Sequence, residues 1–322
     1  MILCCGEALI DMIPTVDVHG RNAYVPHPGG SVFNTAIALG RLGLEPGFLS
    51  GLSTDLFGKM IQNSLAECGV KHALSVYSDL PTTLAFIELN DGHAQYHFYD
   101  ENTAGRMLTE DMHPPIPQTV SAIYFGGISL IVEPCCDFYI SLAKRASLDK
   151  VVMVDPNIRQ SFIRDVDRYR ARLDTLLAAC NILKVSDEDL DWIAPGPLSL
   201  LEKAKELRLK GPEMVILTRG KDGATAIFGD DEIVDVPARK AHVVDTVGAG
   251  DTFNAGVLAA LSVAGVLSKA GIENVTASVV KDVLEFGAQV AAINVSRSGA
   301  NPPWAHELSG LIPPFQNGKN TV

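Results

Sequence analysis

Val244-Asp-Thr-Val-Gly-Ala-Gly-Asp-Thr-Phe-Asn-Ala-Gly256 is the stretch that says most about this chain. Two glycines, Gly248 and Gly250, lie just before Asp251, and apolar residues follow at helical spacing over 252–264. Small residues leading into a helix expose backbone N–H groups at its positive end, where an anion can bind. The carboxylate there can cap the helix, or it can take a proton from a group that attacks the anion. Two interpretations are open: a capped helix, or a site for phosphoryl transfer to an alcohol.

The composition is that of a globular chain with an acidic surface. Of 322 residues, 47% are hydrophobic and 20% charged, which excludes wholesale disorder. The net charge of −12 argues against nucleic acid and anionic membranes as partners. No apolar run reaches about 18 residues, so no membrane span is predicted, and residues 1–8 are typical of a strand rather than a signal peptide. Six cysteines without C-x-x-C spacing argue against a zinc site and favour reduced thiols in a cytoplasmic protein.

Short apolar runs alternate with helical patterns along the chain. The predicted buried strands are 2–5, 122–125, 151–154, 182–185 and 214–217, and helical spacing marks 136–146, 168–179 and 198–209. This alternation predicts an α/β fold with a parallel sheet covered on both faces. In such sheets ligands bind beyond the carboxyl ends of the strands. The polar residues that end these runs should therefore gather at one edge.

Two segments break the alternation. Residues 11–28 are polar, rich in turn residues and short of helix signals. Residues 82–100 alternate like antiparallel strands around Asn90-Asp91-Gly92, which is a hairpin signal. A small β lid over the edge of the sheet is the simplest assembly, and an edge hairpin without a function is the alternative. We therefore expect one domain over residues 1–322, with lid segments at about 11–28 and 82–105.

Two groups of residues near the N-terminus could bind a sugar. Gly29-Gly30-Ser-Val-Phe-Asn34 opens a second predicted helix, 32–42. Paired glycines let a ligand approach the backbone, and the amide of Asn34 can both donate to and accept from hydroxyl groups. Asp11 follows the first strand and can accept two hydroxyl hydrogens. A plain glycine turn and a solvated acid are the structural alternatives.

Polar residues also follow three later strands. Asp155-Pro-Asn-Ile-Arg159 ends one, and its arginine could neutralise phosphate oxygens. Ser186-Asp-Glu-Asp189 follows the next, where acids could hold Mg²⁺ through water or simply begin a helix. Thr218-Arg-Gly-Lys-Asp-Gly223 follows the third and could contact a nucleotide or form a turn to a hairpin. The fact that all these groups follow strand ends is stronger evidence for a binding site than any one group alone.

The chain resembles the PfkB, or ribokinase-like, sugar kinases over almost its full length. Gly29-Gly30 with Asn34 matches the N-terminal signature of that family. Asp245-Thr-Val-Gly-Ala-Gly-Asp251 with Ala255-Gly256 matches the C-terminal signature, which is highly specific. Likeness within the family is greatest to bacterial fructokinases, on the stretches Gly6-Glu-Ala-Leu-Ile-Asp11, Lys184-Val-Ser-Asp-Glu188 and Ser298-Gly-Ala-Asn-Pro-Pro303. The resemblance implies a Rossmann-like, doubly wound core with a mostly parallel sheet, and a β lid that often pairs in a homodimer.

The resemblance and the strand-end placement together define a predicted site. Asp251 is the expected base, and the expected anion hole consists of Gly248, Ala249 and Gly250. The expected sugar-binding residues are Asp11, Gly29, Gly30, Asn34 and Arg159. The expected ATP-binding residues are Lys184, Ser186, Thr218, Gly220, Gly223, Gly248, Gly250 and Asn294. Asp189 is expected to hold Mg²⁺ through water, and Asp245, with the loop around Gly299, a monovalent cation such as K⁺.

These residues predict a phosphotransferase that uses ATP–Mg²⁺ and an alcohol acceptor. Residues 82–101 contain no Lys or Arg, which favours a neutral sugar, although Arg21 and Arg106 lie close in sequence. D-Fructose, phosphorylated at O6, is the expected substrate, and ribose and 2-keto-3-deoxygluconate are the alternatives. A non-catalytic sugar sensor would be expected to lose the base or the glycine loop, and both are intact. A dinucleotide-dependent dehydrogenase would need G-x-G-x-x-G after the first strand, where this chain has a single glycine.

Overall fold

The core of the protein is a sheet of eight strands in the order β14-β13-β12-β11-β10-β9-β1-β4. The structure is a computed structural model that describes residues 1–90 and 93–308. The strands are β1 (Ile2–Cys5), β4 (Gly47–Leu49), β9 (Ala122–Gly126), β10 (Val151–Asp155), β11 (Ile182–Ser186), β12 (Met214–Thr218), β13 (Ala224–Phe228) and β14 (Glu232–Val236). All neighbours are parallel except β12–β13 and β13–β14. The five predicted strands and the mostly parallel sheet are therefore confirmed.

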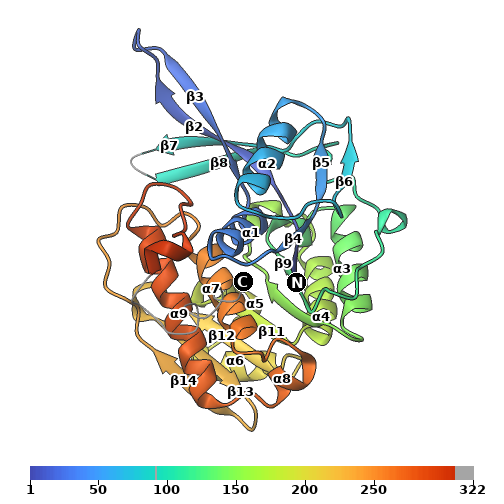
Figure 1. Cartoon of the computed structure of the whole chain (residues 1–322), viewed down its shortest axis with the longest axis vertical. Helices are drawn as coiled ribbons and strands as arrows, with labels where there is room; N and C mark the ends of the chain where they lie inside the picture. Colours follow the sequence, from blue (N-terminus) through green and yellow to red (C-terminus); the bar gives the residue numbers. More distant parts are fainter. Residues whose placement is uncertain (91–92, 309–322) are drawn as a thin grey trace, which may run out of the picture.

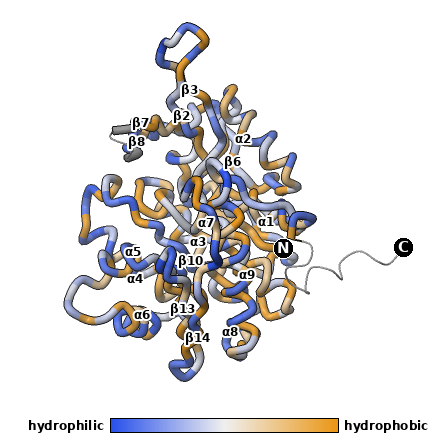
Figure 2. Tube along the Cα trace, turned by 90° about the vertical axis from the view of Figure 1, so that its left-hand side faces the viewer, coloured by the Kyte–Doolittle hydropathy of each residue, from blue (hydrophilic) through white to orange (hydrophobic). Residues whose placement is uncertain are grey.

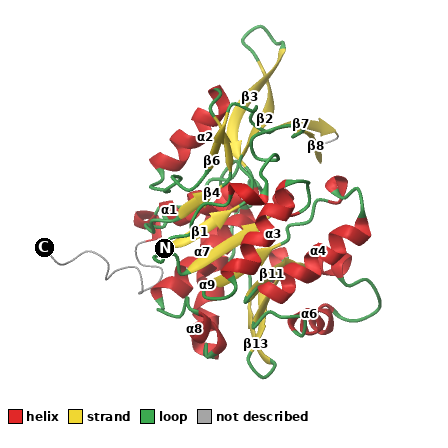
Figure 3. Ribbon diagram, turned by 90° about the vertical axis from the view of Figure 1, so that its right-hand side faces the viewer, coloured by secondary structure: helices red, strands yellow, loops and turns green. Residues whose placement is uncertain are grey.

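Helices cover both faces of this sheet (Figure 3). Successive strand residues point to opposite faces, so Ile2 and Cys4 join one core cluster while Leu3 and Cys5 join another. The first cluster includes α1 (Ser31–Arg41), α2 (Leu56–Glu67), α7 (Ala249–Val263), α8 (Lys269–Glu273) and α9 (Ala277–Val295). The second includes α3 (Cys135–Ala146), α4 (Val166–Ala179), α5 (Asp187–Ile193) and α6 (Leu200–Arg208). The doubly wound α/β fold expected from the sequence is confirmed.

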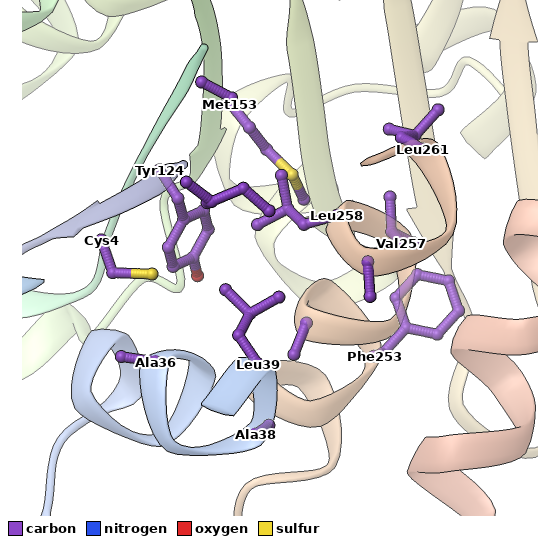
Figure 4. Close-up of a cluster of buried hydrophobic side chains, with 14 of the residues drawn as sticks. Cys4, Ala36, Ala38, Leu39, Tyr124, Met153, Phe253, Val257, Leu258 and Leu261 are labelled. Atoms are coloured by element: carbon purple, nitrogen blue, oxygen red, sulfur yellow. The ribbon is translucent and has the colours of Figure 1, made fainter. Parts of the chain in front are cut away.

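Helices α1 and α7 lie side by side against one face of the sheet, and each signature runs from the segment before one of these helices into its first turns. Leu39 of α1 and Leu258 of α7 point toward Tyr124 and Met153 of the strands (Figure 4). The hydroxyl of Thr35 in α1 donates to the carbonyl oxygen of Asp251, 3.1 Å away in a buried position. Packing therefore holds the first turns of the two helices against each other, although they are far apart in sequence.

Local chemistry explains where the helices begin. Helical spacing suggested a start at residue 198 for α6, but the helix begins at Leu200 because Ser199 and Glu202 form a capping box. Asp165 caps α4 and accepts a hydrogen bond from the N–H of Arg168. Gly248 occupies the cap position of α7 with φ of 72°, which is a left-handed conformation. The site helix thus starts on a glycine without a capping side chain.

A second sheet stands over the carboxyl edge of the first and forms the lid (Figure 1). Its order is β3-β2-β7-β8, from β2 (Leu9–Val16), β3 (Asn22–Gly29), β7 (Leu84–Asn90) and β8 (His93–Tyr99). The segment 11–28, for which the sequence suggested turns, is a regular antiparallel hairpin. The second hairpin is confirmed, whereas its expected turn residues 91 and 92 lie outside the described residues. β5 (Gly51–Ser53) and β6 (Val76–Ser78) form a separate parallel pair.

Candidate active site

A cleft of about 620 Å³ lies between the lid and the carboxyl edge of the central sheet. Nine predicted site residues line it: Asp11, Gly30, Asn34, Arg159, Lys184, Gly248, Ala249, Gly250 and Asp251. The lid contributes Tyr96 and Phe98 to the opposite wall. Residues from both signatures and from two strand ends therefore meet in one cavity, as the topology of an α/β sheet predicts.

The glycine stretch forms the floor of the cleft at the start of α7. The first N–H groups of any helix lack acceptors within that helix, and residues 248–250 line the cleft at this point. Gly248 has no room for a side chain, because a Cβ there would lie 2.7 Å from Cβ of Ala300. The floor is suited to binding an anion through backbone N–H groups and the positive end of the helix.

We expect Gly248→Ala to lower kcat on the order of 10²-fold, because a displaced loop misplaces the N–H groups of the anion hole. Gly265→Ala is the matched control. Gly265 has φ of 71° against 72° for Gly248, but nothing lies within 4 Å of its Cβ position. Both variants should carry roughly 1–2 kcal/mol of backbone strain. Thermal unfolding of the two variants measures the cost of backbone strain, and steady-state kinetics measures the effect of displacing the anion-hole N–H groups. Equal turnover in the two variants would contradict the assignment of residues 248–250 as an anion hole.

Asp251 has the surroundings expected of a general base. Its side chain is buried against α1, and Nδ2 of Asn34 donates to Oδ2 over 2.9 Å. Burial raises the pKa of Asp251 to about 7, while the hydrogen bond from Asn34 and the charge of Lys184 oppose that rise. A carboxylate with a pKa near neutrality can accept a proton at physiological pH. Asn34, expected at the sugar, therefore also contacts the base.

The raised pKa of Asp251 predicts the pH dependence of activity. The base must be ionised to accept a proton, so kcat/KM should be constant above about pH 7 and fall as the pH is lowered through that value. Burial also raises the pKa of Asp11 to about 6, which should steepen the fall at lower pH. Initial rates between about pH 5 and 9, with thermal unfolding at each pH as the control, test this. A flat profile in folded protein would contradict it.

Glu7 is a cleft residue to which the sequence analysis gave no role. Its Oε1 accepts hydrogen bonds from the N–H and the hydroxyl of Ser31, at 3.1 and 2.7 Å, and its Oε2 accepts from the N–H of Ser129 at 3.3 Å. A Cβ on Gly127 would meet Oε1 at 2.0 Å, so this glycine makes room for the carboxylate. Glu7 thus joins the start of α1 to the loop after β9 along the wall of the cleft.

Gly29 does not line the cleft but leaves space for the side chain of Asp11, which does. Gly29 is absent from the lining, and a Cβ at this position would lie 2.2 Å from Oδ2 of Asp11. Asp11 and Gly29 lie on neighbouring strands β2 and β3. The small residue therefore leaves space for the carboxylate, and only Gly30 of the glycine pair lines the cavity.

A buried ion pair lies behind the anion hole. Nζ of Lys184 is 2.9 Å from Oδ2 of Asp155, and both residues are buried at the ends of neighbouring strands. Asn254, one turn after Asp251 on α7, donates to the same oxygen at 2.7 Å. Burial alone would lower the pKa of Lys184, but the Asp155 carboxylate outweighs it and the pKa is raised. A Cβ on Gly250 would lie 3.3 Å from Nζ, so the ammonium group lies against the anion hole.

Several residues expected at the nucleotide lie outside the cleft lining. Ser186 caps α5, with its hydroxyl accepting from the N–H of Asp189 at 3.0 Å. Oδ1 of Asp189 accepts from the N–H of Ile158, and burial raises the pKa of Asp189 to about 6. The stretch begins helix α5 with three acids in its first turn, as the structural alternative expects. Gly223, with φ of 92°, would place a Cβ 2.1 Å from the carbonyl oxygen of Val236, as a tight turn into β13 requires.

Of the remaining predicted residues, Asn294 and Asp245 contact the loops around the glycine stretch, and Thr218 and Gly220 lie elsewhere on the carboxyl edge. Thr218 and Gly220 lie at the end of β12 and in the turn that follows it. Nδ2 of Asn294, on α9, donates to the carbonyl oxygen of Val247 at 2.8 Å. Asp245 accepts hydrogen bonds from the N–H groups of Val247 and Gly299, at 3.0 and 2.8 Å. Asp245 thus links the glycine stretch to the loop around residue 299.

Neither arginine that the sequence placed near the lid reaches the cleft. Arg21 pairs with Asp17 near the end of the first hairpin, at 2.7 Å, and Arg106 pairs with Asp100 at 3.0 Å.

Over residues 1–90 and 93–308, no group of three or more His, Cys, Asp or Glu side chains is arranged to hold a metal ion. The part of the chain that the structure describes also contains no helix with the length and apolarity needed to cross a bilayer.

The sequence and the architecture are both similar to those of known carbohydrate kinases. The family model described as pfkB family carbohydrate kinase matches residues 1–307. A fructokinase of Rhizobium leguminosarum bv. trifolii is 43% identical over 270 residues, which cover 84% of this chain and 82% of that protein. Fructokinase-1 of Zea mays is 30% identical over 325 residues, covering 97% of each chain. The crystal structure of a fructokinase from Xylella fastidiosa with bound ATP is similar with a TM-score of 0.84, at 25% identity and 93% coverage of each chain.

Proposed function

Because the chain belongs to the pfkB family of carbohydrate kinases, we propose that it is a fructokinase that transfers the terminal phosphoryl group of ATP to D-fructose. The product is D-fructose 6-phosphate. The observation that carries this proposal is the position of Asp251, a buried carboxylate directly beside the glycine floor of a cleft under the lid. Likeness to fructokinases supplies the choice of sugar.

The geometry supports an in-line displacement. A sugar hydroxyl gives its proton to Asp251 while its oxygen forms a bond to the terminal phosphorus, and the bond from phosphorus to ADP breaks. The N–H groups of Gly248 and Gly250 and the ammonium group of Lys184 stabilise the charge on the transferring oxygens, while the N–H of Ala249 donates to the carbonyl oxygen of Thr246 at 3.2 Å. Bound Mg²⁺ neutralises charge on the phosphates of ATP. The hydrogen bonds of Glu7 with Ser31 and of Asn34 with Asp251 fix the side chains that line the cleft, and the lid excludes water.

A neutral sugar suits the wall facing the lid. Arg21 and Arg106, the two residues that weakened this argument at the level of the sequence, are paired with carboxylates away from the cleft. An ATP-coupled assay against fructose, ribose and 2-keto-3-deoxygluconate tests the choice, and ³¹P NMR of the product identifies the hydroxyl. The highest kcat/KM should be found for fructose. A higher value for one of the other sugars would replace fructose as the substrate.

We propose that Mg²⁺ is held mainly by ATP, with Asp189 contacting it through water, because Mg²⁺ keeps part of its hydration shell. The half-buried carboxylate of Asp189, which follows strand β11, supports this, and one of its oxygens accepts a hydrogen bond from the N–H of Ile158. For a monovalent cation we propose Asp245 and the loop around Gly299, which are already joined by a hydrogen bond of 2.8 Å. Turnover measured against Mg²⁺, and against K⁺ with Na⁺ as control, tests both sites.

We propose that one kinase domain carries the lid as an insertion and that two lids pair in a homodimer. Exposed apolar side chains on the lid support this: Val16 is 65% exposed and Tyr99 63%. Tyr24, Phe86 and Tyr99 form a row of edge-to-face aromatic contacts. The first hairpin stands clear of the body (Figure 2). Light scattering should give the mass of a dimer, and Tyr24→Glu should shift it toward the monomer.

We also propose a cytoplasmic location. The six cysteines that suggested it in the sequence are all buried thiols, which a reducing compartment preserves. Fractionation of the producing cells tests this, and recovery in a secreted or periplasmic fraction would contradict it.

A further inference from the structure

A second cavity, of about 730 Å³, adjoins the sugar cleft. The two cavities share three lining residues, Tyr96, Phe98 and Ser161. The second is also lined by four arginines, Arg106, Arg164, Arg168 and Arg172, which come from the segment after the lid and from α4 and the loop before it. A space of this size is comparable with a ligand site, and no step of the proposed reaction uses it.

Aromatic side chains form much of the wall that the two spaces share, together with Ser161. Phe98 of β8 meets Phe162 of η3 (Gln160–Phe162) edge to face, with ring centroids 4.5 Å apart. Tyr96 stacks on the other side of Phe98, with centroids 5.9 Å apart. The lid supplies Tyr96 and Phe98, while the body supplies Phe162. This aromatic partition can therefore be shortened from either side without altering the residues around Asp251.

In the cavity behind the partition, the arginines are not paired one to one with carboxylates. Arg168 and Arg172 both pair with a single carboxylate oxygen of Glu133, at 2.8 and 2.6 Å. Arg106 is matched by Asp100, and Arg172 also lies 3.5 Å from Asp137. Arg164 lies 3.5 Å from Glu101, and Asp165 caps α4. The side chain of Arg168 is 54% exposed and shares Glu133 with a second arginine, so its guanidinium can donate to a further carboxylate.

We propose that the aromatic partition determines which sugars this kinase accepts, by closing off an arginine-lined subsite that would bind the carboxylate of a sugar acid. The inference rests on the proposed sugar kinase activity. With Phe98 and Phe162 in place, the cleft offers aromatic faces to the part of the sugar next to the lid and separates an anionic extension from Arg168. With the partition shortened, a sugar acid bound at Asp251 gains access to Arg168.

The experiment compares Phe162→Ala with Phe162→Leu, which retains most of the bulk. For each protein, kcat/KM is measured for fructose and for 2-keto-3-deoxygluconate, a sugar acid. The ratio of acid to fructose should rise by about tenfold in Phe162→Ala and by much less in Phe162→Leu. Wild-type turnover of fructose is measured first, since its absence would contradict the proposed function and not the partition. An unchanged ratio in active Phe162→Ala protein would overturn the inference.

Arg168→Met in the Phe162→Ala background tests the role of charge. It should abolish the gain for the sugar acid and leave fructose turnover unchanged, because Arg168 lies outside the cleft around Asp251. A gain that survives this change would show that space alone matters and would overturn the arginine subsite. If Phe162→Ala unfolds, Phe98→Ala shortens the same partition from the lid. Calorimetric binding of the sugar acid then provides a second readout that does not depend on turnover.

Discussion

Asp251→Asn should lower kcat by roughly 10²–10⁴-fold and leave the protein folded. The amide has the shape of the carboxylate, so it can still accept the hydrogen bond from Asn34 that is 2.9 Å long in the structure. It cannot accept a proton from the sugar hydroxyl. Because the carboxylate is buried and its pKa is raised to about 7, replacing it with a neutral group also removes a charge that burial disfavours. Loss of turnover therefore should not be a consequence of unfolding.

Asp11→Asn is the matched control for this substitution. Asp11 lines the same cleft and its pKa is also raised by burial, but it lies on the lid strand β2 rather than beside the glycine stretch. Its loss should raise KM for the sugar and affect kcat much less. A coupled assay gives both constants, and thermal unfolding gives the stability. Asp251→Asn protein with wild-type kcat would remove the base from the mechanism, and with it the main argument for phosphoryl transfer.

The parts of the site that the sequence could predict are local in the chain. Gly248, Gly250 and Asp251 are adjacent, so the start of α7 positions the anion hole and the base together without any tertiary contact. The strand ends were predictable because apolar runs identify parallel strands and the topology places their carboxyl ends at one edge. Arg159 and Lys184 line the cleft for this reason.

The parts that the sequence could not predict depend on contacts between distant segments. Asp155 and Asn254 meet over 2.7 Å although 99 positions separate them, and Glu7 contacts Ser129 across 122 positions. Hydrophobic periodicity in the sequence does not predict such pairs. The only local signal was Asp155, an acid at the end of a buried strand. Residues 11–28 were expected as a turn-rich lid segment, and their regular strand pairing was not predicted for a different reason. The outer half of this hairpin is exposed on both faces, so it lacks the alternation of a half-buried strand.

Lys184→Met should destabilise the protein by about 3–5 kcal/mol, because it leaves the buried carboxylate of Asp155 without its partner. It should also lower kcat on the order of 10²-fold, because an ammonium group beside the anion hole is lost. These two effects are confounded in the single variant. Urea unfolding and steady-state kinetics measure each, but neither alone says whether Lys184 acts on the phosphoryl group or only keeps Asp155 in place.

The double variant Asp155→Asn with Lys184→Met separates the two roles. Without a buried charge on either side, stability should recover most of the loss, and the amide oxygen of Asn at 155 can still accept the hydrogen bond from Asn254. Turnover should stay low, because the positive charge next to Gly250 is still missing. If kcat recovered together with stability, Lys184 would be a structural partner of Asp155 alone. The backbone N–H groups of Gly248 and Gly250 and Arg159 would then have to stabilise the transferring phosphoryl group without it.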